Sequence, residues 1–369
     1  MDLPIMGLDS LKSLRRKMDR TSWTFRSLFA PETAKELHNL ASHFALFCDE
    51  QVARIWGTKW HDWLQEQDLR VSLFTFPSGE GFKTRKGKEI LEDELFSKGF
   101  GRDSCCIALG GGITMDLVGF LAATFCRGVP LVFAPTTLLG MVDACMGGKN
   151  GVNCSFGKNL IGSFYPPALI FLDLEMLTTL EDRAWLEGLS EVIKYALIAA
   201  PDLFALLQTQ TLATLKKKEI LQKMIERSLT IKHAIVMRDP EERLGERRIL
   251  NFGHTIAHAL EVESAYTLSH GAALYLGMRV ESLISQEMGM LSQKARSDID
   301  ALLSRFAIDI SHSPDQAKVK RAFSRDKKAI HERPRFVLLQ QIGKAAPCQG
   351  AYCTHVPEEI IENALKTCL

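Results

Sequence analysis

The sequence predicts an α/β protein in which a Rossmann-like N-terminal domain, with a mainly parallel sheet, is followed by an all-α-rich C-terminal domain. Two observations lead to this prediction. Short, continuously apolar runs alternate with helical patterns up to about residue 180, and long helical patterns dominate after that point. Strands that are apolar along their whole length are typical of parallel sheets, because helices cover both faces of such a sheet. A chain of 369 residues is also long enough for two cores.

Five apolar runs in the first half are the predicted strands. They cover residues 45–48, 71–76, 105–109, 130–134 and 169–172. Helical patterns over residues 86–98 and 115–126 lie between some of them, which is the alternation expected of a parallel sheet with helical crossovers. Four glycines between residues 147 and 157 predict a loop after the fourth strand.

Helical patterns fill the second half. They cover residues 183–199, 203–215, 220–236, 254–264, 271–288 and 292–306, with one short strand at 336–339. The change of pattern places the boundary near Asp182 and gives domains 1–182 and 183–369. A cleft between two such domains is the usual place for a small-molecule site. Residues 8–17 alternate leucines with basic residues and predict a short amphipathic surface helix.

The composition excludes several classes of protein. With 46% hydrophobic and 24% charged residues the chain has the composition of a globular protein. A formal charge of +1 argues against a nucleic-acid binder, and we find no apolar run of the length of a membrane span. The nine cysteines form no Cys-x-x-Cys pair and several lie in apolar runs, which predicts reduced thiols and a cytoplasmic location.

Three histidines form the first candidate site. His254 and His258 are four residues apart and His270 follows. On a helix the first two project from one face, and imidazoles held in this way are a common start to a transition-metal site. A structural histidine pair is the alternative.

Glycines and threonines at strand ends form the second candidate site. Gly110-Gly-Gly112 follows a predicted strand and precedes a predicted helix, so it is placed to bring backbone N–H groups and a helix N-terminus onto a phosphate. Asp116 lies one turn into that helix, where it either caps the turn or reaches a ligand. Thr136 and Thr137 follow the next strand. Ligands of open parallel sheets bind outside such carboxyl ends, although a tight structural turn explains the glycines equally well.

Charged residues form two further clusters. Asp143, Lys149, Lys158 and Asn159 lie among glycines, an arrangement that suits an anion or, alternatively, a solvated basic loop. Glu191 and Lys194 are three apart within an apolar helical pattern. Unpaired buried charges are costly, so a metal for the carboxylate and an anionic substrate for the ammonium would resolve that cost. A surface ion pair is the alternative.

Taken together, these segments closely resemble 3-dehydroquinate synthases, with matches in family order from about residue 45 to 345. The matching motifs are Gly110-Gly-Gly112 with Asp116, Arg127-Gly128, Pro135-Thr-Thr-Leu-Leu139, Asp143, Gly147-Gly-Lys149, Gly157-Lys-Asn159, Glu191-Val-Ile-Lys194, Asn251-Phe-Gly-His-Thr255, His258, His270-Gly271 and Asp326-Lys-Lys328. The resemblance implies a dehydroquinate synthase-like fold and an NAD- and zinc-dependent cyclase. This enzyme would convert 3-deoxy-D-arabino-heptulosonate 7-phosphate, a phosphorylated sugar acid, into 3-dehydroquinate and phosphate.

The resemblance also implies a role for each matching residue. The ligands of Zn²⁺ (or Co²⁺) would be Glu191, His254 and His270, so that His258 moves from the metal to the phosphate. The other phosphate-side residues would be Lys149, Asn159, Lys327 or Lys328, and Arg127 from the partner subunit of a homodimer. Lys194, Lys232, Arg247 and Asn251 would hold the substrate's carboxylate and hydroxyls. The NAD-binding residues would be Asp49, Glu80, Lys83, Gly111, Gly112, Asp116, Thr136, Thr137, Asp143, Lys149 and Lys158. The catalytic set would be Asp143, Lys149, Lys194, Lys232, Arg247, Asn251 and His258.

The chain departs from the family pattern at two points. Relatives usually have Glu where this chain has Ala272, which predicts the loss of a carboxylate that orients a metal ligand. One extra residue lies between Glu242 and Asn251, so Arg247 is a shifted match. The alternative functions are another sugar-phosphate cyclase of the 2-epi-5-epi-valiolone synthase type, a glycerol dehydrogenase-like polyol oxidoreductase, and an inactive NAD-binding relative.

Overall fold

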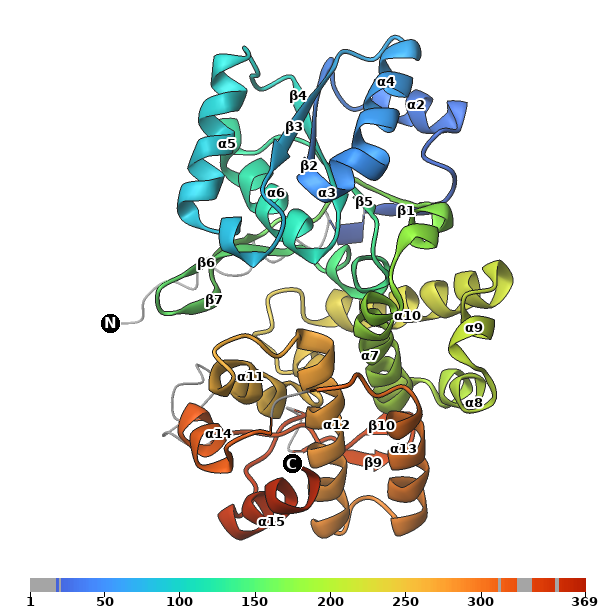
Figure 1. Ribbon diagram of the computed structural model, residues 1–369, viewed down its shortest axis with the longest axis vertical. Coiled ribbons are helices and arrows are strands. Elements are labelled where there is room, and N and C mark those ends of the chain that lie inside the picture. The colour runs from blue at the N-terminus through green and yellow to red at the C-terminus, as the bar shows by residue number, and fades with distance from the viewer. Residues whose placement is uncertain (1–17, 20, 311–312, 324–333, 349–351) are drawn as a thin grey trace. The chain divides into compact units, whose positions relative to one another are not determined.

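The computed structural model describes residues 18–19, 21–310, 313–323, 334–348 and 352–369 (Figure 1). The chain divides into two compact units, Met1–Leu180 and Glu181–Leu369. The helix predicted over residues 8–17 lies outside the described residues.

A six-stranded parallel sheet is the centre of the first unit. Its order is β1-β8-β5-β4-β2-β3. The strands are β1 (Ser22–Phe25), β2 (His43–Asp49), β3 (Val71–Phe76), β4 (Ser104–Gly110), β5 (Leu131–Pro135) and β8 (Leu169–Leu172). Every residue of β4 is buried, as expected of a central strand in a sheet covered on both faces. The five predicted strands and the parallel sheet are confirmed, and β1 is an addition at the sheet edge.

Helices connect these strands. They are α2 (Pro31–His38), α3 (Glu50–Val52), α4 (Thr58–Glu66), α5 (Arg85–Ser97) and α6 (Gly112–Thr124), with the π-helical turns Ala53–Gly57 and Gly140–Ala144. The predicted helices correspond to α5 and α6. Thr84 is the N-cap of α5, and its side chain accepts a hydrogen bond from the backbone N–H of Gly87 at 3.0 Å.

The order of the sheet contains a topological switch point. The chain passes from β2 to β3 on one side and then continues through β4 and β5 on the other side of β2. The loops that leave β2 and β4 therefore diverge, and ligands of open parallel sheets usually bind outside the carboxyl ends of strands at such a point. Asp49 ends β2 and Gly110 ends β4, so two of the predicted ligand segments lie at this point.

The loop predicted from the glycines at residues 147–157 is wrong. The segment forms an antiparallel hairpin of β6 (Lys149–Cys154) and β7 (Gly157–Phe164). Asn150 of β6 joins the two arms of the hairpin, since its amide donates to the carbonyl of Tyr165, directly after β7, at 2.7 Å. The hairpin packs against α6. Glycine disfavours strands locally, but cross-strand pairing and packing outweigh that preference here.

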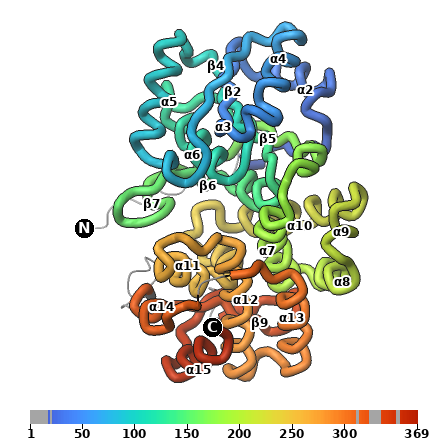
Figure 2. The backbone as a smooth tube through the Cα atoms, in the orientation of Figure 1, coloured from blue at the N-terminus to red at the C-terminus, as the bar shows by residue number. Residues whose placement is uncertain are grey.

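The second unit is mainly helical, as predicted, and Figure 2 follows its chain from α7 to α15. The helices are α7 (Asp182–Ala199), α8 (Pro201–Thr209), α9 (Leu212–Leu215), α10 (Lys218–Arg238), α11 (His254–Glu263), α12 (His270–Glu287), α13 (Gln293–Arg305), α14 (Gln316–Phe323) and α15 (Glu358–Cys368). The helix α12 is central, because α7, α11, α13 and α15 all pack against it.

Two local predictions for this unit need correction. The helix expected over 203–215 is two helices, because Thr211 caps α9 through a reciprocal capping box with Thr214. The strand expected over 336–339 is shifted: Phe336 forms an isolated bridge with Thr354, and β9 (Leu339–Gln341) pairs with β10 (Lys344–Ala345).

The cysteine prediction is confirmed, since all nine cysteines are free thiols and five of them are buried. Burial raises the pKa of the Cys48 thiol to about 12. Among the residues that the structure describes, no helix has both the length and the apolar character required to cross a bilayer.

Candidate metal and substrate site

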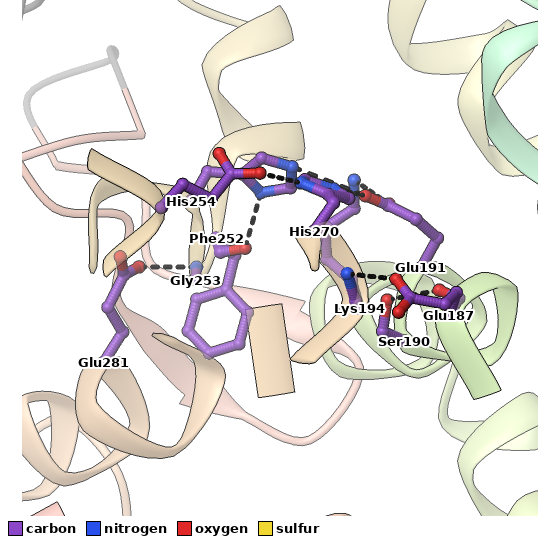
Figure 3. Close-up of polar contacts among 11 residues, drawn as sticks. Glu187, Ser190, Glu191, Lys194, Phe252, Gly253, His254, His270 and Glu281 are labelled. Atoms are coloured by element: carbon purple, nitrogen blue, oxygen red, sulfur yellow. Dashed lines mark hydrogen bonds and ion pairs between the residues drawn. The ribbon is translucent and has the colours of Figure 1, made fainter. Parts of the chain in front are cut away.

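Three helices of the second unit bring one carboxylate and two imidazoles together (Figure 3). Glu191 lies in α7, His254 is the first residue of α11, and His270 is the first residue of α12. Nε2 of His254 lies 3.4 Å from Oε1 of Glu191, and Nε2 of His270 lies 3.3 Å from the same oxygen. The three potential ligand atoms all lie within 4.8 Å of one another.

The donor set fits a zinc-type ion. Protein zinc sites use His nitrogens and carboxylate oxygens, and catalytic sites usually have three protein ligands with a position left for water or substrate. His258 is exposed, and its ring centroid lies 5.5 Å from that of His254. The helical spacing of this histidine pair is confirmed, but within the described part of the chain the group with metal-site geometry contains Glu191 in place of His258.

Hydrogen-bonding groups orient both imidazoles. Nδ1 of His254 lies 3.2 Å from the carbonyl of Phe252, which can only accept a hydrogen bond. Nδ1 of His254 therefore carries the proton, and Nε2 is the nitrogen that faces Glu191. Nδ1 of His270 lies 3.6 Å from Oε1 of Glu261. A carboxylate thus does lie beside this imidazole, although Ala272 supplies none.

The charges of the cluster are strongly coupled. Burial by itself would raise the pKa of Glu191, but the Lys194 ammonium and the two imidazoles outweigh it and hold this pKa well below its usual range. Burial and the Lys194 charge lower the pKa of His254. Burial also lowers the pKa of His270, yet the bonds to Glu191 and Glu261 outweigh it and raise this pKa to about 10.

Lys194 is a buried cation next to the cluster. Its side chain is 3% exposed, and its Nζ forms an ion pair with Oε2 of Glu191. The surface-pair alternative for these residues is therefore wrong. Lys194 Nζ also lies 4.9 Å from the centre of the Tyr195 ring, which adds a cation–π contact.

The other predicted substrate residues of this unit lie on neighbouring elements. Lys232 is buried in α10, and Arg247 is buried at the start of the 3₁₀ turn Arg247–Asn251. The backbone N–H of Arg247 donates to Asp239 at 3.2 Å, and its guanidinium donates to the carbonyl of Pro240. Asn251 donates to Oε1 of Glu242 at 2.9 Å. Lys327 and Lys328 lie outside the described residues.

In the first unit a polar network joins three of the predicted NAD-binding residues, Glu80, Lys83 and Asp116. Lys83 is only 4% exposed, and its Nζ donates to Oδ2 of Asp116 at 2.6 Å. The same Nζ lies 3.8 Å from Glu80, and Glu80 accepts a hydrogen bond from Asn153 at 2.7 Å. The N-cap of α6 is Gly111, which has no side chain to cap the helix. The Asp116 carboxylate, for which capping of the turn and contact with a ligand were both predicted as alternatives, pairs with Lys83.

The glycine turn and the threonines lie close together at the ends of β4 and β5. The backbone N–H of Thr136 donates to the carbonyl of Gly110 at 2.9 Å. Thr137 Oγ1 accepts from the backbone N–H of Gly140 at 3.0 Å. Gly112 begins α6, and Asp143 lies in the π-helical turn that follows Thr137.

The remaining predicted residues of the first unit occupy the hairpin and one tight turn. Lys149 begins β6 and is exposed, whereas Lys158 and Asn159 lie in β7. The backbone N–H of Asn159 donates to Asn153 Oδ1 at 2.9 Å. Arg127 is exposed at a φ of 69°, which is an uncommon backbone conformation for a residue with a side chain.

Asp49 caps a helix. Its Oδ1 accepts from the N–H groups of Gln51 and Val52 and from the hydroxyl of Ser78. We expect Asp49→Ala to lower the free energy of unfolding by about 1 kcal/mol and Asp49→Asn to change it little, because Asn caps helices as well as Asp does. Urea denaturation of both variants measures this effect, and equal losses in the two variants would contradict it.

Comparison with known proteins identifies the family. The family model described as 3-dehydroquinate synthase N-terminal matches residues 73–187, and the one described as 3-dehydroquinate synthase C-terminal matches residues 188–329. The 3-dehydroquinate synthase of Chlamydia caviae is 37% identical over 324 residues, which cover 83% of this chain and 85% of that protein. This chain belongs to the 3-dehydroquinate synthase family.

Solved structures give the fold of this 3-dehydroquinate synthase family member independently. A 2-epi-5-epi-valiolone synthase from Streptomyces hygroscopicus, solved with NAD⁺ and Zn²⁺, is 26% identical, with a TM-score of 0.84 and coverage of 94% of this chain and 95% of that one. A 2-deoxy-scyllo-inosose synthase, solved with carbaglucose-6-phosphate, NAD⁺ and Co²⁺, has a TM-score of 0.86 at 24% identity, with coverage of 95% and 96%. The predicted dehydroquinate synthase-like fold is confirmed.

Three carboxylates of this family member were not predicted as site residues. Glu187 precedes the ligand Glu191 by one helical turn, Glu261 follows His254 by two turns, and Glu281 lies in α12. The spacings i,i+4 and i,i+7 put the first two on the same helix face as a ligand, which is the signal available in the sequence. Glu281 has no such spacing to a ligand.

Proposed function

We propose that this chain is an active 3-dehydroquinate synthase. The proposed reaction converts 3-deoxy-D-arabino-heptulosonate 7-phosphate into 3-dehydroquinate and phosphate, through transient oxidation, phosphate β-elimination, re-reduction and an intramolecular aldol closure. In this reaction the enzyme is a carbon–oxygen lyase of the shikimate pathway. The observation that carries the proposal is the convergence of Glu191, His254 and His270 beside the buried Lys194 in a chain of this family.

The second unit is the proposed metal-binding unit, and the first is the proposed NAD-binding unit. Glu191, His254 and His270 would hold Zn²⁺ (or Co²⁺), because their ligand atoms converge and both Nδ1 atoms face hydrogen-bonding groups. NAD would lie outside the carboxyl ends of β2 and β4, where Asp49 and the N-terminus of α6 meet the switch point. When bound, NAD would take up and return a hydride, and the metal would act as a Lewis acid on the substrate's hydroxyls.

Buried cations of the second unit support an anionic substrate. Lys194, Lys232 and Arg247 are all less than 10% exposed, and buried cations attract an anion more strongly than exposed ones do, because water screens them less. In the proposed complex these side chains, with Asn251, hold the carboxylate and hydroxyls of the substrate. Lys194 then lies between a ligand carboxylate and the substrate, so it limits repulsion between two anions.

The phosphate end is assigned to a second set of residues. Lys149, Asn159 and His258 would bind the phosphate with Lys327 or Lys328, and Asp143 would lie near the ring hydroxyls. Arg127 would reach the phosphate of the partner subunit in a homodimer. Its exposure and its strained backbone support this role, since strain of this kind is concentrated at functional sites. Fixed cations around the phosphate would stabilise the charge that develops as it leaves.

Phosphate release tests the function. Purified, metal-loaded protein with NAD and the heptulosonate phosphate should release phosphate without net formation of NADH. Net NADH on a simple polyol would instead identify a polyol dehydrogenase. Release from a sugar phosphate that lacks the carboxylate, but not from the heptulosonate phosphate, would identify another sugar-phosphate cyclase. A folded, metal-loaded protein that releases no phosphate from the heptulosonate phosphate would overturn the proposal.

The assembly and the location of the enzyme belong to the same proposal. A homodimer should appear in analytical ultracentrifugation. An Arg127→Ala copy should regain phosphate release when it is mixed with a copy that carries a different inactivating substitution, because the second copy supplies an intact Arg127. A cytoplasmic location is supported by nine free thiols, because such thiols persist in reducing compartments.

A further inference from the structure

A carboxylate of α7 holds the start of α12. Oε2 of Glu187 accepts a hydrogen bond from the backbone N–H of Gly271 at 2.7 Å. This N–H is one of the first-turn donors that lack a partner within the helix, and the N-cap residue Ser269 has no side-chain cap. The contact is close, because a Cβ on Gly271 would lie 2.6 Å from Cα of Glu187. Glu187 therefore anchors Gly271, which directly follows the ligand His270.

A carboxylate of α12 holds the start of α11 in the same way. Oε2 of Glu281 accepts from the backbone N–H of Gly253 at 2.7 Å, as Figure 3 shows. Gly253 is the N-cap of α11, with a φ of +80°, and it directly precedes His254. Glu281 is fully buried. A buried carboxylate is expensive, so its place at a positively polarised helix N-terminus provides part of its stabilisation.

A carboxylate of α11 completes the arrangement. Glu261 lies two turns after His254, and its Oε1 is 3.6 Å from Nδ1 of His270 in α12. Each of the three helices therefore provides one ligand residue and one carboxylate that fixes a ligand on another helix. The helix α7 carries the ligand Glu191 and the carboxylate of Glu187, α11 carries His254 and Glu261, and α12 carries His270 and Glu281.

We propose that Glu187 and Glu281 are positioning residues that set the two histidine ligands by anchoring the backbone beside them. The inference rests on the proposed metal site. Glu187 thus brings a carboxylate to the first turn of α12, where Ala272 of this chain supplies none. Metal ligation tolerates errors of only about 0.2 Å in the ligand distances, so a small shift of either helix start reduces the affinity for the metal.

Cobalt titration of the apo protein tests the inference. Co²⁺ bound to N/O ligands gives visible absorption that reports both affinity and geometry. We expect Glu187→Ala to weaken Co²⁺ binding by roughly 10–100-fold, the usual effect of losing a group that orients a ligand, and to alter the absorption band. Glu187→Gln should retain most of the affinity, because its amide oxygen can accept the same N–H. Glu281→Gln should behave similarly.

Controls separate positioning from general stability. Asp182→Ala removes an exposed carboxylate from the first turn of α7, and Glu287→Ala removes one from the end of α12. Both should bind cobalt as the wild type does. Glu187→Ala with wild-type affinity and spectrum would overturn the inference, even if its melting temperature fell. A wild-type protein that binds no cobalt would instead overturn the proposed function. If Glu187→Ala does not fold, Glu187→Asp replaces it, because its shorter carboxylate cannot keep the same contact. Wild-type affinity for cobalt in Glu187→Asp would then overturn the inference.

Discussion

Alanine at position 254 should release the metal from this protein, whereas alanine at position 258 should leave it in place. Nε2 of His254 lies within the cluster of ligand atoms, and its Nδ1 faces the carbonyl of Phe252. His258 is exposed one turn further along α11. Loss of a direct ligand should weaken zinc binding by more than the roughly 10–100-fold that loss of a supporting group costs.

Metal analysis of the two purified variants after dialysis against a weak chelator measures the difference. Circular dichroism of both proteins is the control for folding. The His258→Ala variant should keep its zinc while its phosphate release falls, because that residue is assigned to the phosphate. Equal loss of zinc in both variants would return the site to a set of three imidazoles and overturn the ligand assignment.

Removal of the Lys194 charge should destabilise the metal-free protein strongly. The Lys194→Met variant keeps most of the side-chain volume but leaves Glu191, only 2% exposed, without its ammonium partner. Breaking a buried ion pair on one side typically costs about 3–5 kcal/mol. Zinc should restore much of this loss, because the ion places positive charge beside the same carboxylate and binds only the folded state.

Chemical denaturation with and without zinc measures both effects. Lys216→Met is the matched control, since it breaks a pair with Asp182, whose side chain is 73% exposed, and such exposed pairs contribute less than about 1 kcal/mol. Zinc should therefore stabilise the Lys194 variant more than it stabilises the wild type or the control. A loss below 1 kcal/mol, or an equal gain from zinc in all three proteins, would contradict the prediction.

Local patterns in the sequence predicted much of the first unit. The runs Val71–Phe76 and Leu169–Leu172 were predicted to the residue, because an apolar run between polar turns favours a buried strand over any alternative. The hairpin of β6 and β7 was missed for the opposite reason. Its glycines have no strand preference, and its pairing is stabilised by contacts with α6, a helix that is distant along the chain.

Local patterns also predicted one part of the candidate site and missed another. The spacing of His254 and His258 predicted a helical pair near a metal, and the spacing of Glu191 and Lys194 predicted a semi-buried charge pair. Family resemblance, rather than spacing, joined Glu191 to His254 and His270. The i,i+4 spacing places Glu187 on the helix face of the ligand Glu191, but no local pattern indicates that Glu187 and Glu281 accept hydrogen bonds from the backbone of other helices.

The sequence by itself determined the residue types, the helices that carry them and the family. Those follow from periodicity, capping and motif, which act over a few residues. Only the tertiary structure decided which carboxylate meets which helix start, because that depends on how α7, α11 and α12 pack together. The physical reason is that a backbone N–H at a helix start can donate a hydrogen bond to any nearby anion, so its partner is chosen by packing and not by the local sequence.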